Sequence, residues 1–358
     1  MARHPLFRLP RFASRGARHP LLRALRGVLA LALLGVVILQ VHWRDYPVTD
    51  ETGRIVTSPG VLSCLGRVDP KWLAAALAVS VASLIVAAVR WRLLLTALDI
   101  RIPFGETVKL QFLGEFFSTV IPGMVSGDLV KACCVMPKTT QKAHVLVSVF
   151  VDRLLGICGM VCMAVVMLLV LFAAGHADAG LLRLSAPSVA VVSAGVCGAL
   201  VFLLSPRLRR LCGLQRLYAR LPVAEHIERA GVALRRYRAR PQALARAFLA
   251  TLVAQLLGSA FVVLLGWALG LGVPWPHYFL HVPLIMIISA VPLTPGGIGL
   301  MEQLYLLYFA AAGNPSLVLA LAVLVRATTL AGALPGGLVA AFGGYATAGA
   351  AMAGQDHG

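Results

Sequence analysis

The sequence predicts an all-α polytopic membrane protein with about six full transmembrane helices and two opposed re-entrant helical hairpins, and an inverted repeat is one way to arrange them. Of the 358 residues, 59% are hydrophobic and 13% are charged, whereas a soluble domain is about half apolar and about a quarter charged. The mean hydropathy of the sequence is +0.86. Together these values exclude a soluble enzyme, a disordered tail and a fibrous protein. Apolar stretches approach the length of a spanning helix, and Pro and Gly interrupt one further stretch in each half.

The uninterrupted spans follow from the apolar stretches taken in order. The first is expected at 27–41, after seven arginines. Residues 42–70 carry turn formers and a net charge of −1, which predicts a loop outside the cell. The second span, 72–95, contains Arg90-Trp91-Arg92 near its end, where an aromatic ring and two cations suit the membrane interface. The later spans are expected at 144–174, 186–204, 247–270 and 316–342.

The first interruption lies in residues 104–136, which are too polar for a lipid-facing helix and contain Pro122, Gly123 and Gly127. Because Pro removes a backbone donor and Gly loosens a helix, we expect two half-helices that meet at 121–127. The Gly123–Gly127 spacing could also be a helix-packing face, but the flanking Pro and Ser favour a tight turn. Non-helical backbone at membrane depth survives only beside protein or a wet cavity, so the interruption predicts a cavity.

The second interruption lies in residues 279–309. If each broken element enters and leaves the membrane on the same side, it does not cross the membrane. Six crossings then remain, and both termini are inside. The first hairpin then enters from the cytoplasm and the second from outside. Paired interruptions in two halves are the sequence signature of substrate sites in secondary transporters. The residues at the centre of this second element are Pro292, Pro295, Gly296, Gly297 and Gly299.

Ionisable residues in these stretches need partners, water or a ligand, because a charge at the bilayer centre costs about 2.5–3.5 kcal/mol. Asp128 and Lys131 can pair at i and i+3, whereas the adjacent Asp152 and Arg153 point in different directions. Either the charges only tie helices together, or they line a path for an anionic head group with Lys131, Arg153 and Arg326 contacting phosphate. The predicted substrate-binding residues are Glu115, Pro122, Gly127, Asp128, Lys131, Asp152, Arg153, Pro295, Gly296, Gly297, Gly299, Glu302 and Arg326.

The placement of basic residues predicts the organisation of the chain. The formal net charge is +18, and eighteen of the 32 Lys and Arg residues lie in 1–27 and 205–246, next to apolar stretches. This is the pattern of cytoplasmic loops and of attraction to anionic lipids, so we expect membrane lipids and no nucleic acid as partners. We expect a basic cytoplasmic segment at 1–26, one integral membrane domain at 27–344 and a short tail at 345–358. Residues 205–246 are expected to form an Arg-rich amphipathic segment, either a linker or a lipid-binding surface.

The sequence gives no sign of catalytic, metal or cofactor chemistry. The seven Cys show no metal-ligand spacing, and a single one, Cys64, falls in a predicted outer loop. His277 and His281 could share a helix face, but no carboxylate lies close to them in sequence. Gly296-Gly297-x-Gly299 lacks the strand–helix setting of a nucleotide site. We therefore expect no catalytic residue, no metal and no cofactor.

A series of motifs, in order over about residues 70–340, resembles the lysylphosphatidylglycerol synthase transmembrane-region family, also called flippase-like membrane proteins. Where this chain has Ser126 and Lys131, the family usually has Gly and Arg, and it commonly has Arg where this chain has Met301. The matching segments are Arg90-Trp91, Leu113-Gly114-Glu115-Phe116-Phe117, Ile121-Pro122-Gly123, Ser126-Gly127-Asp128-Leu129-Val130-Lys131, Ser148-Val149-Phe150-Val151-Asp152-Arg153, and Pro292 through Glu302.

The resemblance implies a protein of the bacterial inner membrane that moves aminoacylated, glycosylated or polyprenyl-linked lipids, or another anionic lipid, between leaflets. In fused members a soluble domain performs the aminoacyl transfer, and this sequence carries none, so an enzyme is not expected. One alternative is an integral membrane glycosyltransferase with Asp45, Asp50 or Glu51 as the base. Another is a non-catalytic partner of a lipid-modifying enzyme, docked through 205–246. A homo-oligomer is also left open.

Overall fold

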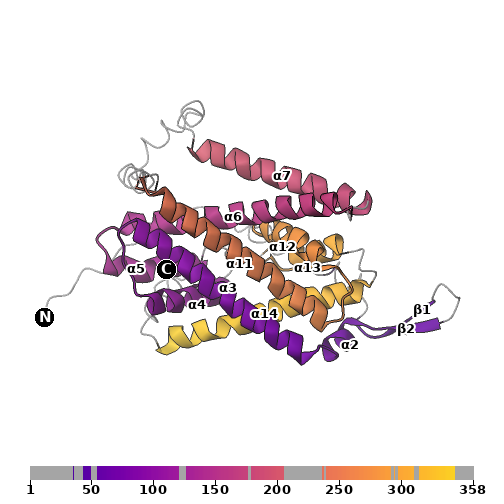
Figure 1. The fold of residues 1–358 in the computed structure, drawn as a ribbon. Coiled ribbons are helices and arrows are strands. Elements are labelled where there is room, and N and C mark those ends of the chain that lie inside the picture. The colour runs from indigo at the N-terminus through magenta and orange to yellow at the C-terminus, as the bar shows by residue number, and fades with distance from the viewer. Residues whose placement is uncertain are drawn as a thin grey trace.

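The computed structural model describes residues 35, 43–49, 55–120, 126–175, 179–204, 236–237, 239–291, 294, 297–309 and 314–342 (Figure 1). The predicted first span, 27–41, lies outside these residues apart from Gly35, which is helical. The segments 1–26 and 345–358, and most of the Arg-rich segment 205–246, lie outside them as well.

Five long helices form the frame of the described part of the protein, and each has a stretch that is long and apolar enough to cross a membrane. They coincide with five of the six predicted spans, so the prediction of an all-α, multi-pass membrane protein is confirmed. Pro stands at the start of α3 and α11, where its missing N–H costs nothing. The five helices are α3 (Pro70–Ala97), α6 (Lys142–Ala173), α7 (Ala179–Leu204), α11 (Pro241–Ala268) and α14 (Pro315–Phe342).

Hairpin 1 consists of α4 (Phe104–Val120) and α5 (Ser126–Val135), followed by the short helix η1 (Met136–Lys138). Its helices run antiparallel, because Lys138 pairs with Glu106 at one end and Lys131 Nζ lies 3.1 Å from Gln111 Oε1 further along. Near the other end, a Cβ on Gly127 would collide with the carbonyl of Gly114. The predicted turn over 123–127 does not extend to Gly127, which lies in the first turn of α5 and allows two helix backbones to touch, whereas 121–125 lie outside the described residues.

Hairpin 2 consists of α12 (Trp275–Ser289) and α13 (Leu300–Tyr308). The ring centroids of Tyr278 and Phe309 are 5.0 Å apart and those of His281 and Tyr308 are 5.3 Å apart, so these helices also run antiparallel. The backbone turns into α13 through Gly297 and Gly299, whose φ angles of 67° and 81° favour glycine.

The two hairpins enter the bundle from opposite ends. Helices α3 and α11 pack antiparallel, with the Trp72 and Trp267 rings 5.0 Å apart at one end and Arg240 Nη1 donating to Ala97 O at the other. Hairpin 1 starts shortly after α3 ends, and hairpin 2 starts shortly after α11 ends. The end that hairpin 1 enters is called the basic end, because it carries Arg101, Lys138, Lys142, Arg236 and Arg240.

The chain repeats itself in inverted orientation. Helices α3, α4, α5 and α6 have 28, 17, 10 and 32 residues, and α11, α12, α13 and α14 have 28, 15, 9 and 28. Ser83 and Ala254 are each the fourteenth residue of their helix, and Ser83 Oγ donates to Ala254 O at 3.2 Å. Equivalent residues thus meet where two antiparallel helices cross, which is where a two-fold axis must pass. Helix α4 packs on α14 as α12 packs on α6.

The two halves also share a helix end. After α3 the N–H of Ile100 donates to Leu95 O, and after α11 the N–H of Leu271 donates to Gly266 O, at the same positions of both helices. Each cap needs a residue with positive φ, which is Asp99 (63°) in one half and Gly270 (69°) in the other. We call 70–173 the first half and 241–342 the second half.

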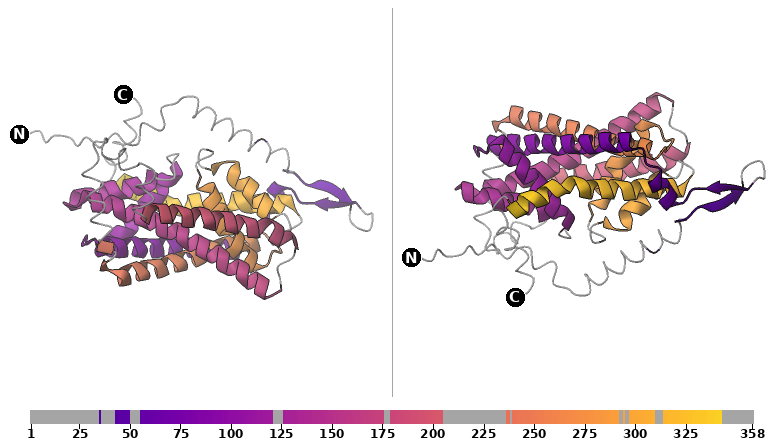
Figure 2. Two further views of the ribbon diagram at one scale, coloured as in Figure 1. Left: turned by 90° about the horizontal axis from the view of Figure 1, so that it is seen from above. Right: turned by 90° about the horizontal axis from the view of Figure 1, so that it is seen from below.

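The predicted outer loop contains more structure than expected. Strands β1 (Tyr46–Thr49) and β2 (Ile55–Ser58) pair antiparallel with Tyr46 opposite Ser58, and α2 (Val61–Gly66) follows. β-Branched residues in both segments favour strands. Figure 2 shows this β-hairpin projecting beyond the helices at the end opposite the basic end.

The burial of Trp91 corrects the prediction that Arg90-Trp91-Arg92 lies at the membrane interface. Trp91 is not at an interface: it is fully buried, its Nε1–H donates to Ser148 Oγ at 3.3 Å, and Lys131 Nζ lies 5.1 Å above its ring. The exposed tryptophans of the described residues are Trp43, Trp72, Trp267 and Trp275, and they lie at the end opposite the basic end, as in a membrane-interface belt.

Candidate functional site

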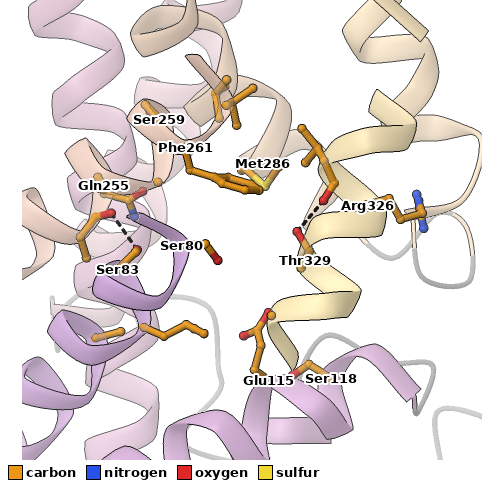
Figure 3. A pocket seen from close by; sticks show the side chains of 18 of the residues that line it. Ser80, Ser83, Glu115, Ser118, Gln255, Ser259, Phe261, Met286, Arg326 and Thr329 are labelled. Atoms are coloured by element: carbon orange, nitrogen blue, oxygen red, sulfur yellow. Dashed lines mark hydrogen bonds between the residues drawn. The ribbon is translucent and has the colours of Figure 1, made fainter. Parts of the chain in front are cut away.

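A cavity of about 870 Å³ lies between the tips of the two hairpins (Figure 3). Its wall is built from α3, α4, α11, α12 and α14, with Met160 of α6 and with Ile298 and Met301 at the start of α13. The sequence predicted a cavity beside the interruptions, and the structure has one between them.

At three pairs of equivalent positions the wall of this cavity is polar in the first half and apolar in the second, whereas Leu84 and Gln255, each the fifteenth residue of its helix, show the reverse. Arg90 is the twenty-first residue of α3, and Phe261 is the twenty-first of α11. Gln111 and Glu115 are the eighth and twelfth residues of α4, and their counterparts in α12 are Val282 and Met286. All six line the cavity. In Figure 3, Glu115 and Ser118 point into it from one side, with Phe261 and Met286 across from them.

Arg90 is held in the polar wall by Asp152. Its Nε and Nη2 donate to the two carboxylate oxygens at 2.6 and 2.8 Å, a bidentate pair between α3 and α6. Asp152 is buried. The expectation that Asp152 and Arg153 need separate partners is therefore confirmed, but Arg90, the partner of Asp152, was missing from the predicted site because it was assigned to the interface.

Asp128 and Lys131 together join three helices. Asp128 Oδ1 lies 2.8 Å from Lys131 Nζ within α5, as the i, i+3 spacing predicts, and Asp128 Oδ2 pairs with Arg153 of α6. Asp128 and Lys131 are both buried, and Lys131 also reaches Gln111 of α4. Glu115 interacts electrostatically with this cluster. Among the described residues no hydrogen bond or ion pair holds the Glu115 carboxylate, which faces the cavity.

Glu302 organises the start of α13. Its Oε2 accepts a hydrogen bond from Gly299 N at 2.8 Å, and its Oε1 lies 2.9 Å from Arg326 Nη2 of α14. Glu302 is buried, whereas the Arg326 side chain is partly exposed and points away from the middle of the cavity in Figure 3.

The predicted site residues that the structure describes divide into three groups. Glu115 and Arg326 line the cavity, and Asp128, Lys131, Asp152, Arg153 and Glu302 tie its helices together by the ion pairs above. Gly127, Gly297 and Gly299 shape the backbone of the hairpins. Pro122, Pro295 and Gly296, like Pro292 and Gly123, lie outside the described residues. Gln111 and Gln255 line the cavity and were missed, because an uncharged polar residue in a span is a weak sequence signal.

Other groups considered from the sequence do not form a site in the part of the chain described. No three His, Cys, Asp or Glu side chains there could hold a metal ion. His281 is buried, and its Nε2 lies 3.0 Å from Ser185 Oγ. Asp45 accepts a hydrogen bond from Gly60 N at 2.8 Å, and hydrogen bonds from Ser63 and from this backbone N–H hold the pKa of Asp45 below its usual range. It is a loop anchor in this structure. Asp50 and Glu51 lie outside the described residues.

The comparisons with known proteins agree with this architecture. The family model described as "Lysylphosphatidylglycerol synthase TM region" matches residues 60–337, which include both halves of the repeat almost completely. A search of curated proteins gave no match.

Proposed function

Because this chain belongs to the lysylphosphatidylglycerol synthase transmembrane-region family, we propose that it moves a lipid with a phosphate-bearing head group between the leaflets of a bacterial inner membrane. The family supports the coarser statement that this is a membrane protein related to lipid modification or transport. The finer proposal rests on one observation, the two-sided cavity between opposed hairpins.

The cavity matches an amphipathic ligand. A charged or zwitterionic head group needs polar partners at membrane depth, because an unpaired charge there is costly. Arg90, Gln111 and Glu115 supply such partners on one wall. Phe261, Val282 and Met286 on the facing wall suit an acyl or polyprenyl chain. One lipid molecule can therefore satisfy both walls, whereas an ion or a sugar would leave the apolar wall uncovered.

Arginine donors support the anionic class of head group. The side chains of Arg153 and Arg326 are 47% and 31% exposed, although each pairs with a buried carboxylate. A guanidinium carries five N–H donors in a planar fork that fits phosphate oxygens, so each can hold a carboxylate and still meet a lipid. Aminoacylated, glycosylated and polyprenyl-linked phospholipids all offer the required phosphate.

The charge distribution supports an orientation. Arg101, Lys138, Lys142, Arg236 and Arg240 gather at the basic end, which the positive-inside rule assigns to the cytoplasm. The exposed tryptophans then lie at the outer interface. We propose that the protein acts as a transporter and not as an enzyme.

Lipid exchange in vesicles tests the proposal. The full chain is reconstituted with fluorescent phosphatidylglycerol, and a membrane-impermeant reductant bleaches the outer leaflet. We expect bleaching to continue beyond the outer leaflet in protein-containing vesicles, and Arg153→Ala and Arg326→Ala to slow it by about tenfold. Lys71→Ala, an exposed change away from the cavity, is the control. Exchange no faster than in empty vesicles, across anionic, aminoacylated, glycosylated and polyprenyl lipids, would contradict the proposal.

A further inference from the structure

Two ion pairs occupy equivalent positions in the inverted halves. Asp128 is the third residue of α5, and Glu302 is the third residue of α13. Their partners Arg153 and Arg326 are each the twelfth residue of the long helix that follows, α6 and α14. Each pair therefore ties the inner end of one hairpin to the next long helix.

Each acid keeps a second partner inside its own hairpin. Asp128 contacts Lys131 of the same helix at 2.8 Å, and Glu302 accepts from Gly299 N at 2.8 Å. If a hairpin moved away from its arginine, Asp128 would keep the opposite charge of Lys131, and Glu302 would keep its hydrogen bond at the N-terminus of α13. Both contacts lower the cost of breaking the ion pair. The arginine side chains are already partly exposed, 47% for Arg153 and 31% for Arg326, although Nε and Nη2 of Arg326 are buried. These pairs are built so that they can separate.

The Arg90–Asp152 pair differs in its location and in its exposure. It joins two long helices, and both of its side chains are largely buried. Its equivalent positions in the second half are occupied by Phe261 and Val325, so it has no counterpart. We call the Arg90–Asp152 pair the fixed link. Variants of this pair are the control for variants of the other two pairs.

The position of each hairpin decides what its movement would uncover. The residues of α4 that line the cavity are in its later part, and the earlier part of α4 extends toward the basic end. In hairpin 2 the cavity residues are likewise near the tip, and the rest extends toward the opposite end. Each hairpin thus fills the space between the cavity and the end that it enters.

We propose that Asp128–Arg153 and Glu302–Arg326 are the two gates of the cavity, an inference that rests on the proposed lipid-moving function. Separation of the first pair opens the cavity at the basic end, and separation of the second opens it at the opposite end. Both pairs are closed in this structure. Opening of one gate at a time gives a lipid head group access from one leaflet and then from the other.

Cysteine accessibility tests the gates without relying on lipid movement. The seven native cysteines are replaced, and Ser118→Cys places one thiol on the cavity wall. The full chain is reconstituted in vesicles of phosphatidylglycerol and phosphatidylethanolamine, and a charged maleimide is applied to one side at a time. Arg101→Cys and Lys71→Cys, both exposed, identify which side carries the basic end.

We expect Arg153→Gln to raise labelling of residue 118 from the basic end by about tenfold, and Arg326→Gln to raise it by about tenfold from the opposite end only. Both variants leave the acid one contact within its hairpin, Lys131 for Asp128 and Gly299 N for Glu302, so folding should survive. Asp128→Asn and Glu302→Gln should reproduce the same sidedness. Asp152→Asn, which breaks the fixed link, should lower the melting temperature without a sided change.

Two results would overturn the gates: equal labelling increases from both sides, or unchanged labelling in variants that elute and melt like the parent. The outcome is separable from the proposed function. Sided labelling without lipid exchange would reject the lipid-moving role and keep the gates. Lipid exchange without sided labelling would reject the gates alone.

Discussion

The two halves of this molecule share a scaffold and differ in what they place on it. Helices α3 and α11 have the same length, end in the same cap and cross at equivalent residues. Yet Arg90, Glu115 and Asp152 in the first half stand where the second half has Phe261, Met286 and Val325. Backbone architecture therefore does not require these charges. We propose that these charges serve the lipid-moving function, and the predictions below exchange residues between the halves to test this.

The largest change in stability is expected at the fixed link, the Arg90–Asp152 ion pair. Arg90→Phe installs the residue of the second half and leaves Asp152 buried without its partner, which should lower the free energy of unfolding by about 3–5 kcal/mol. The double variant Arg90→Phe with Asp152→Val introduces both apolar residues of the second half and should recover most of the lost free energy of unfolding. Thermal unfolding in detergent measures both. A double variant as unstable as the single one would show that the halves are not interchangeable here.

The next effect concerns the packing of hairpin 1. Gly127→Ala should destabilise the protein by about 1–3 kcal/mol, because its Cβ would meet the Gly114 carbonyl and the helices must move apart. The second half has Met301 at this position of α13, so hairpin 2 does not depend on such contact. Gly105→Ala in the same hairpin meets no neighbouring atom and is the control. Equal melting temperatures for both variants would contradict the close approach.

The chemistry of the two cavity walls should control lipid movement. Glu115→Met installs the residue that the second half has at this position, and it should slow exchange of fluorescent phosphatidylglycerol by about tenfold, with little change in melting temperature. Met286→Leu, which keeps the second wall apolar, should leave exchange close to that of the parent. If the two variants exchange lipid equally, the polar wall is not part of the path.

The smallest effect is expected at the cap after α3. A hydrogen bond from Arg240, with the charges of Arg236 and Arg101, holds the pKa of Asp99 below its usual range. A lowered folded pKa stabilises the protein above the unfolded pKa, and this contribution is lost as the pH falls through the folded pKa.

Asp99→Gly introduces the residue that the second half has at the equivalent position, Gly270. The variant relieves the positive φ and loses the ion pairs, so stability at neutral pH should change by less than about 1 kcal/mol. Asp99→Asn keeps the side-chain shape without the charge. The difference in melting temperature between this variant and the parent should shrink below about pH 4. A difference that grows in acid would contradict the assignment.

Sequence patterns were sufficient to predict the membrane spans and the two interruptions. A continuous apolar stretch must become a helix in lipid, because no water can satisfy its backbone, and five predicted spans are present in the described residues. The Asp128–Lys131 pair also follows from local spacing. Arg90 was misassigned because a cation near the end of an apolar stretch usually reaches the interface, and a partner 62 residues away, Asp152, changes that outcome.

What the sequence determined by itself is therefore local: apolar length, Pro and Gly interruptions, and charges that must find partners. The tertiary structure decided the rest. Antiparallel packing of α3 on α11 brings the hairpins in from opposite ends, and the cavity wall joins residues from helices far apart in the chain. Such contacts depend on which helix faces lie together across the bundle, and the period of one helix carries no information about its neighbour.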